Sequence, residues 1–281
     1  MEHGWADADG LSIHYLTAGD PDDPTVVLLH GGVIDCASLS WGGVLDRLAE
    51  GRHVIAPDLA GYGESDRPDA DYSTAWHVGV VESLMDDLGL ESPSVVGISL
   101  GGGIAIGLTL RSPGRVDRLV PVDSYGLGRD LPNGLLSWAL SRVPQINRLS
   151  LWLLARSERL TRASLGGTVV DPATVPDEVV AELHERVGRP EAGKAFRRWR
   201  HAEVSREGYR TDYTDRLDGL VTPTLFLHGE ADELFPVEWA REAAELVPDA
   251  RLETFEDVAH WPPREAPDRF VGALDGFLPR A

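Results

Sequence analysis

The sequence predicts an α/β fold in which a mostly parallel central sheet has helices on both faces and carries one inserted helical segment. Near both ends of the chain, short β-branched runs alternate with helical patterns, which is typical of parallel strands connected through helices. Continuous apolar runs such as residues 25–29 are typical of strands that are covered on both faces. Between residues 124 and 215, leucine and tryptophan recur at helical spacing and no convincing strand is found. A chain of 281 residues is long enough for one large core with an added lobe.

The predicted elements divide the chain into three parts. Residues 1–124 should form the first part of the core, with strands at 11–16, 26–29, 54–56, 94–98 and 118–122 and helices at 74–88 and 101–110. Residues 125–214 should form an all-helical cap, with helices at 135–140, 146–155, 178–187 and 194–204. Residues 215–281 should complete the core, with strands at 224–228 and 252–255 and helices at 238–246 and 267–278. Two segments of one sheet are therefore expected to flank the cap.

Composition and charge limit the classes of partner. The formal net charge is -20, from 46 acidic and 26 basic residues, and this excess should repel nucleic-acid phosphates and anionic lipid headgroups. We therefore expect a small-molecule substrate and neither nucleic acid nor membrane as a partner. The start of the chain has no basic residue and no apolar run, and the single cysteine, Cys36, excludes an internal disulfide. These features predict a cytoplasmic protein in which Cys36 is a packing residue.

The acidic residues are spread along the whole chain, and Lys194 is the only lysine. Such a surface suits a salt-rich cytoplasm, because the Debye length falls to about 3 Å at 1 M salt and self-repulsion is then screened. A halophilic source is one hypothesis. A high-GC genome with an ordinary acidic protein is the other.

A candidate nucleophile lies in the motif Gly97-Ile98-Ser99-Leu100-Gly101, where an apolar strand gives way to a helix. A nucleophile on such a tight turn is held in a strained backbone conformation, and small residues two positions before and after it avoid a clash. The turn also directs the backbone N–H of Leu100 toward a developing oxyanion. A dinucleotide-binding turn is the main rival, but Gly-x-Gly-x-x-Gly would require glycine where Ser99 stands.

A second donor for an oxyanion hole is expected from the run His30-Gly31-Gly32, which follows an early apolar strand. Paired glycines let backbone N–H groups approach a ligand closely. Gly32 is the preferred donor and Val33 the alternative. His30 is predicted to brace the loop and not to transfer protons.

A serine nucleophile needs a base, and His260 is the strongest of nine histidines because it follows the last predicted strand. Asp232 follows the preceding strand and would orient the His260 ring and stabilise its positive charge. Glu230, Glu233 and Asp123 remain competitors for that role.

The chain order Ser99, Asp232, His260 resembles that of the α/β-hydrolase superfamily, in its branch with a serine nucleophile and a helical cap. The resemblance covers nearly the whole chain outside the cap. It includes three further motifs besides the serine turn, namely Asp58-Leu59-Ala60-Gly61-Tyr62-Gly63-Glu64-Ser65, His228-Gly229-Glu230-Ala231-Asp232 and His260-Trp261-Pro262. It implies the α/β-hydrolase fold and a catalytic triad of Ser99, Asp232 and His260.

The substrate class follows less directly from the resemblance. Haloalkane dehalogenases and soluble epoxide hydrolases of this superfamily use an aspartate nucleophile, so Ser99 argues against both. The loop after Gly32 lacks the glycine- and proline-rich continuation typical of the carbon–carbon bond hydrolases, which favours a carboxylesterase or lactonase. A carbon–carbon bond hydrolase and a receptor-like protein with slow turnover remain open. No cofactor or metal is expected, and Trp138, Trp152 and Trp199 are candidates either for the pocket or for packing.

Overall fold

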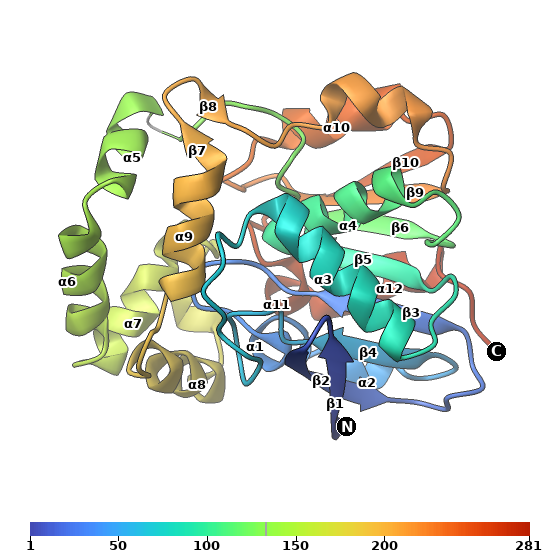
Figure 1. The fold of residues 1–281 in the computed structure, drawn as a ribbon, viewed down its shortest axis with the longest axis horizontal. Coiled ribbons are helices and arrows are strands. Elements are labelled where there is room, and N and C mark those ends of the chain that lie inside the picture. Colours follow the sequence, from blue (N-terminus) through green and yellow to red (C-terminus); the bar gives the residue numbers. More distant parts are fainter. Residues whose placement is uncertain (133) are drawn as a thin grey trace.

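The computed structural model describes residues 1–132 and 134–281, and its centre is an eight-stranded sheet in the order β1-β2-β4-β3-β5-β6-β9-β10 (Figure 1). The strands are β1 (Glu2–Ala8), β2 (Leu11–Ala18), β3 (Thr25–Leu29), β4 (His53–Pro57), β5 (Ser94–Ile98), β6 (Leu119–Val122), β9 (Thr224–Gly229) and β10 (Ala250–Phe255). From β4 to β10 along this order, neighbouring strands pair in parallel. At the other edge, β1 pairs antiparallel with β2, and β2 pairs antiparallel with β4. The predicted mostly parallel sheet is confirmed.

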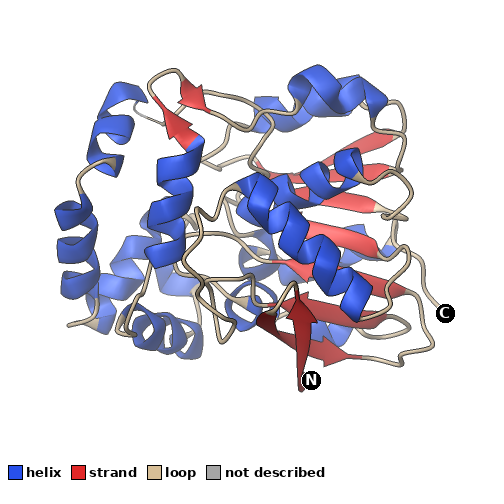
Figure 2. Cartoon of the chain, viewed as in Figure 1, coloured by secondary structure: helices blue, strands red, loops and turns tan. Residues whose placement is uncertain are grey.

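Helices cover both faces of the sheet, as Figure 2 shows. One face carries α3 (Thr74–Asp87), α4 (Leu100–Arg111) and α10 (Val237–Leu246), and the other carries α1 (Ala37–Trp41), α2 (Leu45–Leu48), α11 (Pro262–Glu265) and α12 (Pro267–Asp275). Successive residues of β3 point to opposite faces. Val27 and Leu29 pack with the α4 side, whereas Val26 and Leu28 pack with the α12 side. An apolar run without alternation is what a strand buried on both faces requires.

The first strand, β1, was not predicted. Its sequence Glu-His-Gly-Trp-Ala-Asp-Ala has little β propensity, and it pairs along its whole length with β2 at the edge of the sheet. Backbone pairing with a neighbouring strand therefore determines its conformation more than its own side chains do.

The segment between β6 and β9 lies beside the carboxyl ends of the strands, at the left of Figure 1. It contains α5 (Gly134–Ser141), α6 (Pro144–Leu154), α7 (Glu158–Ser164), α8 (Asp177–Val187) and α9 (Lys194–Glu203), with short 3-10 turns at Leu165–Gly167, Pro172–Thr174 and Thr214–Gly219. A hairpin of β7 (Val204–Ser205) and β8 (Gly208–Tyr209) departs from the expected all-helical segment. Each of these strands has only two residues, too few to give a readable alternation.

A buried carboxylate ties this segment to the sheet. Glu203, at the end of α9, accepts hydrogen bonds from the backbone N–H of Thr74 at 2.7 Å and the hydroxyl of Tyr125 at 3.2 Å. Thr74 begins α3 and Tyr125 follows β6, so the contact fixes α9 over the strand ends. Among the described residues, no helix combines the length and apolar character that crossing a bilayer would require.

Candidate active site

Ser99 lies at the turn between β5 and α4, as the sequence predicted. Its φ of 55° and ψ of -119° place a non-glycine residue in a rarely populated backbone conformation. A Cβ on Gly97 would lie 2.2 Å from the carbonyl oxygen of Gly101, and one on Gly101 would lie 2.2 Å from that of Leu29. Neither position can accept a side chain without movement of the backbone. The two glycines therefore permit the tight turn that presents Ser99.

The loop after β3 lies next to this turn. A Cβ on Gly31 would be 3.5 Å from the Cβ of Ser99. The buried His30 ring accepts from the N–H of Leu59 at 2.9 Å through Nε2 and donates from Nδ1 to the carbonyl of Gly31 at 2.7 Å. His30 therefore braces the loop as predicted. Gly32 and Val33 both line the cavity that contains Ser99, and Leu100, as the first residue of α4, has an N–H without a partner inside the helix.

Asp35 supports the same loop, although sequence reasoning did not single it out. Its Oδ2 accepts from the N–H of Gly31 at 2.8 Å and the hydroxyl of Ser40 at 2.7 Å, and its Oδ1 accepts from the N–H of Cys36. Burial raises the pKa of Asp35. Cys36 is fully buried in the apolar core, and burial also raises the pKa of its thiol, in agreement with the predicted packing role.

His260 follows β10, and its Nδ1 lies 2.7 Å from Oδ2 of Asp232, in the loop after β9. The other oxygen of Asp232 accepts from the N–H groups of Leu234 and Phe235 at 2.7 and 3.3 Å. Burial alone would raise the pKa of Asp232, but the charge and hydrogen bond of His260 hold it below its usual value. The carboxylate is thus ionised and correctly placed to keep a proton on Nδ1, which leaves Nε2 of His260 free to accept one.

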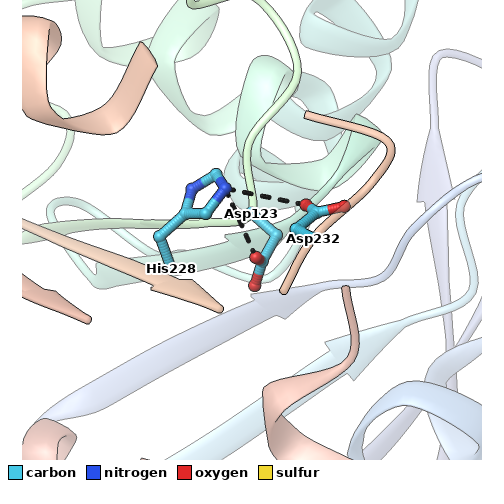
Figure 3. A group of neighbouring side chains, drawn as sticks. All are labelled: Asp123, His228 and Asp232. Carbon is cyan, nitrogen blue, oxygen red and sulfur yellow. Dashed lines mark ion pairs between the residues drawn. The ribbon is translucent and has the colours of Figure 1, made fainter. Parts of the chain in front are cut away.

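Asp123, the competing acid, lies beside Asp232 and His228 (Figure 3). Its Oδ1 accepts from the N–H of Gly229 at 2.9 Å, and Nε2 of His228 lies 3.6 Å from both carboxyl groups. Burial, followed by the negative charge of Asp232, raises the pKa of Asp123 well above its usual range. Two adjacent buried carboxyl groups cannot both ionise readily, so Asp123 is the neutral member. Its hydrogen bond to the end of β9 makes it a brace for the Asp232 loop.

Among the described residues, these three also come nearest to forming a metal site. Each offers one possible ligand atom, and the three atoms lie within 4.8 Å of one another. However, Oδ2 of Asp232 already accepts the His260 hydrogen bond, and Nε2 of His228 donates to the carbonyl of Phe235 at 3.0 Å. Burial lowers the pKa of His228, which keeps the ring neutral. The contacts therefore describe a hydrogen-bonded support behind His260 in which the Asp232 and His228 atoms are already engaged, while Oδ2 of Asp123 has no hydrogen-bond partner among the described residues.

Glu265 holds the loop that carries His260. Its Oε1 accepts from the N–H groups of Ala259 and Trp261, at 3.0 and 3.2 Å, on either side of the histidine. Its Oε2 accepts from Val170 at 2.7 Å, and the N–H of His260 donates to Thr168 at 3.0 Å. Residues 168–170 belong to the segment between β6 and β9, so this segment helps to position the histidine.

Ser99 and His260 line one cavity of about 430 Å³, within the usual range for small-molecule sites. Residues from α6, α8 and α9 form the wall opposite the strand ends. The described lining is almost wholly apolar or aromatic and contains no lysine or arginine; it comprises Gly31, Gly32, Val33, Ile34, Asp35, Ile98, Ser99, Leu100, Tyr125, Leu151, Leu154, Ser164, Leu165, Thr168, Leu183, Val187, Phe196, Trp199, Tyr209, Leu234, Phe235, His260 and Trp261.

Of the predicted residues, Ser99, His260, Gly32 and Leu100 line this cavity, and Asp232 contacts His260 from behind. Of the competing acids, Glu230 contacts the hydroxyl of Thr254 instead, and Glu233 is exposed. Trp199 lines the cavity, whereas Trp152 lies half exposed on α6.

Sequence reasoning missed the aromatic wall formed by Phe196, Tyr209 and Phe235. The sequence signalled only Phe196, which lies three residues before Trp199 and so at helical spacing from it.

Comparison with known proteins agrees with the observed fold. The alpha/beta hydrolase fold family matches residues 24–267. The 2-hydroxymuconate semialdehyde hydrolase of Pseudomonas sp. strain CF600 is 30% identical over 280 residues, covering 96% of this chain and 90% of that protein.

Solved structures give the same result. The 2-hydroxy-6-oxo-6-phenylhexa-2,4-dienoate hydrolase of a Rhodococcus strain superposes with a TM-score of 0.81 at 26% identity, over 98% of this chain and 97% of that one. Est816, described as an N-acyl homoserine lactone degrading enzyme, superposes with a TM-score of 0.77 at 27% identity, over 98% of this chain and all of the other. The chain belongs to the alpha/beta hydrolase fold family.

Proposed function

We propose that this hydrolase cleaves uncharged carboxylic esters or lactones through an acyl-enzyme intermediate on Ser99. The observation that carries the proposal is the 430 Å³ cavity, which contains Ser99 and His260 and whose described lining offers no cationic side chain. In this proposal, residues 1–124 and 215–281 form the catalytic core and residues 125–214 the cap that closes the cavity.

The contacts of His260 suggest how the reaction would proceed. Because Nδ1 is bound to Asp232, Nε2 takes the proton of the Ser99 hydroxyl while Oγ attacks the acyl carbonyl. The N–H groups of Leu100 and Gly32 then donate to the oxyanion. His260 returns the proton to the leaving alkoxide, which departs as the alcohol. A water molecule repeats the sequence, attacks the acyl group and releases the carboxylic acid.

A carbon–carbon bond hydrolase is the second candidate, because two of the similar proteins are named for semialdehyde or dienoate substrates. A dienoate carries a carboxylate, and a buried carboxylate is costly unless a cation or several donors meet it. The only charged side chain in the described lining, Asp35, is acidic and would repel it if ionised. The electrostatics of the cavity therefore favour a neutral acyl substrate.

A comparison of substrates tests whether the enzyme cleaves esters or carbon–carbon bonds. We expect the enzyme to turn over p-nitrophenyl butyrate or a short acyl lactone many times. Its kcat/KM for 2-hydroxy-6-oxo-hexa-2,4-dienoate should be lower by roughly a hundredfold or more, the cost of a carboxylate without a partner. Faster cleavage of the dienoate would instead support the carbon–carbon bond hydrolase. A stoichiometric burst without turnover on any ester would indicate a binding protein.

A further inference from the structure

The helix α6 is apolar on two opposite sides. Leu151 and Leu154 line the catalytic cavity, whereas Ile146, Leu149 and Leu153 point outward at positions i, i+3 and i+7. A helix of a globular protein normally has a polar outer face, and one that is apolar all round is normally buried. Here the outer side is exposed, since 58% of Leu149 and 50% of the neighbouring Trp152 are accessible.

The preceding helix extends this surface. Leu135 and Leu136 of α5 are 65% and 62% exposed, and Figure 1 shows α5 and α6 along the outer edge of the molecule, away from the sheet. We call this surface the α5–α6 face; its exposed apolar members are Leu135, Leu136, Leu140, Val143, Ile146, Leu149, Trp152 and Leu153. Contiguous exposed apolar surface of this kind marks an interaction site.

Charge distinguishes the α5–α6 face from the rest of the molecule. The chain contains 46 acidic residues, yet residues 131–157 contain none and include Arg142, Arg148 and Arg156. Arg156 lies over the Trp152 ring, with its guanidinium carbon 3.6 Å from the ring centroid. Burial, and then the charge of Arg148, lowers the pKa of Arg197 on α9, so positive charges are neighbours here. Arg148 and Arg156 form no ion pair with any carboxylate that the structure describes.

From the combination of exposed leucine and tryptophan with arginines that lack acidic partners, we infer that the α5–α6 face docks on the surface of an anionic phospholipid bilayer. Helices that lie in the headgroup region combine an apolar face carrying tryptophan and leucine with flanking arginines. The whole-chain charge predicts repulsion from such a surface. However, charges on distant faces are largely screened beyond the Debye length of about 8 Å at physiological salt, so the local arginines dominate the contact.

A second copy of the chain fits this face less well. A symmetric contact would bring Arg148 and Arg156 of both copies into one interface to which residues 131–157 contribute no carboxylate, which is a repulsive arrangement. Docking on lipid would bring α6 between the bilayer and the cavity, because Leu151 and Leu154 form part of the cavity wall. The lipid-docking inference does not depend on the proposed ester hydrolysis.

Co-sedimentation with vesicles tests the inference, with the Ser99→Ala protein used so that no lipid is hydrolysed. We expect binding to vesicles of phosphatidylglycerol and phosphatidylcholine, weaker binding to phosphatidylcholine alone, and loss of binding as salt increases. Trp152→Ser should lower the partition coefficient by about tenfold, the scale for removing a large buried apolar group. Trp5→Ser is the matched control, because Trp5 is 57% exposed on β1, far along the chain from this face. It should change binding by less than about twofold.

Melting temperatures of both variants show whether they remain folded, and a Leu149→Ser variant provides a second change on the same face. If the folded Ser99→Ala protein did not bind phosphatidylglycerol vesicles, or if Trp5→Ser and Trp152→Ser weakened binding equally, the inference would be wrong. A dimer in sedimentation equilibrium that dissociates with Trp152→Ser, without vesicle binding, would also overturn it and identify a self-association surface. Because binding is measured without catalysis, these results are independent of whether esters are hydrolysed.

Discussion

The Nδ1 atom of His260 lies 2.7 Å from Oδ2 of Asp232, whereas Oδ1 of Asp123, the other acid at a strand end, accepts a hydrogen bond from the N–H of Gly229. The two carboxyl groups therefore differ in ionisation as well as in position. Asp232 has a lowered pKa and Asp123 a raised one. One acts directly on the histidine ring, and the other supports the loop that presents the first.

Asparagine substitutions should separate these two roles. Asp232→Asn should lower kcat by about three to four orders of magnitude, because the amide would hold the imidazole in the wrong tautomer. Asp123→Asn replaces a neutral carboxyl with a group of equal size and should cost less than about tenfold. The measurement is kcat for a p-nitrophenyl ester with variants shown to be folded by circular dichroism. The reverse order of effects would move the catalytic acid to Asp123.

Glu265 is expected to position the His260 loop without touching the substrate. Glu265→Ala leaves the N–H groups of Ala259, Trp261 and Val170 without their acceptor and should lower the free energy of unfolding by about 1–3 kcal/mol. It should lower kcat more than it changes KM, with partial rescue in Glu265→Gln, which keeps one acceptor oxygen. The exposed Glu256→Gln is the control. A loss of stability with unchanged kcat would leave Glu265 a purely structural role.

Asp58 gives the fold a defined acid sensitivity. Burial opposes its ionisation, but hydrogen bonds from His14 and from the N–H groups of Glu64 and Ala37 lower its pKa from 3.8 to about 2. A lowered folded-state pKa contributes stability that is present above the unfolded pKa and is lost as the pH falls from about 4 through about 2. The contribution at neutral pH is about 2 kcal/mol.

Urea titrations of the wild type and Asp58→Asn between pH 6 and pH 2 would measure this loss. The wild type should lose stability more steeply than the variant in the acid range. Parallel curves would show that Asp58 does not control it.

The acidic surface predicts a response to salt. The melting temperature should rise from low salt to molar KCl, because screening weakens repulsion among the carboxylates. Sucrose at matched osmolality is the control for general exclusion effects. A melting temperature that stays flat or falls with KCl would remove the hypothesis of a halophilic source.

Particular residues show how far sequence reasoning reaches. Ser99 and Asp232 were singled out because each follows an apolar strand, and His260 because it follows the last predicted strand; parallel strands bring their carboxyl ends to one edge. The same logic could not find Glu265, since its role depends on backbone N–H groups that only the folded loop brings together. It also missed β1, whose pairing with β2 outweighs weak local propensity. The whole-chain charge, likewise, gave no sign that residues 131–157 carry the opposite charge on an exposed apolar surface.

In the proposed mechanism, Ser99 carries an acyl intermediate during turnover. Rapid acid quenching of the enzyme with p-nitrophenyl butyrate, followed by intact-protein and peptide mass spectrometry, measures this directly. We predict a transient adduct of one butyryl group on the peptide containing Ser99, absent from Ser99→Ala and formed at a rate at least equal to kcat. Turnover at an undiminished rate in Ser99→Ala, or an adduct on another residue that forms as fast as the ester is consumed, would contradict this mechanism.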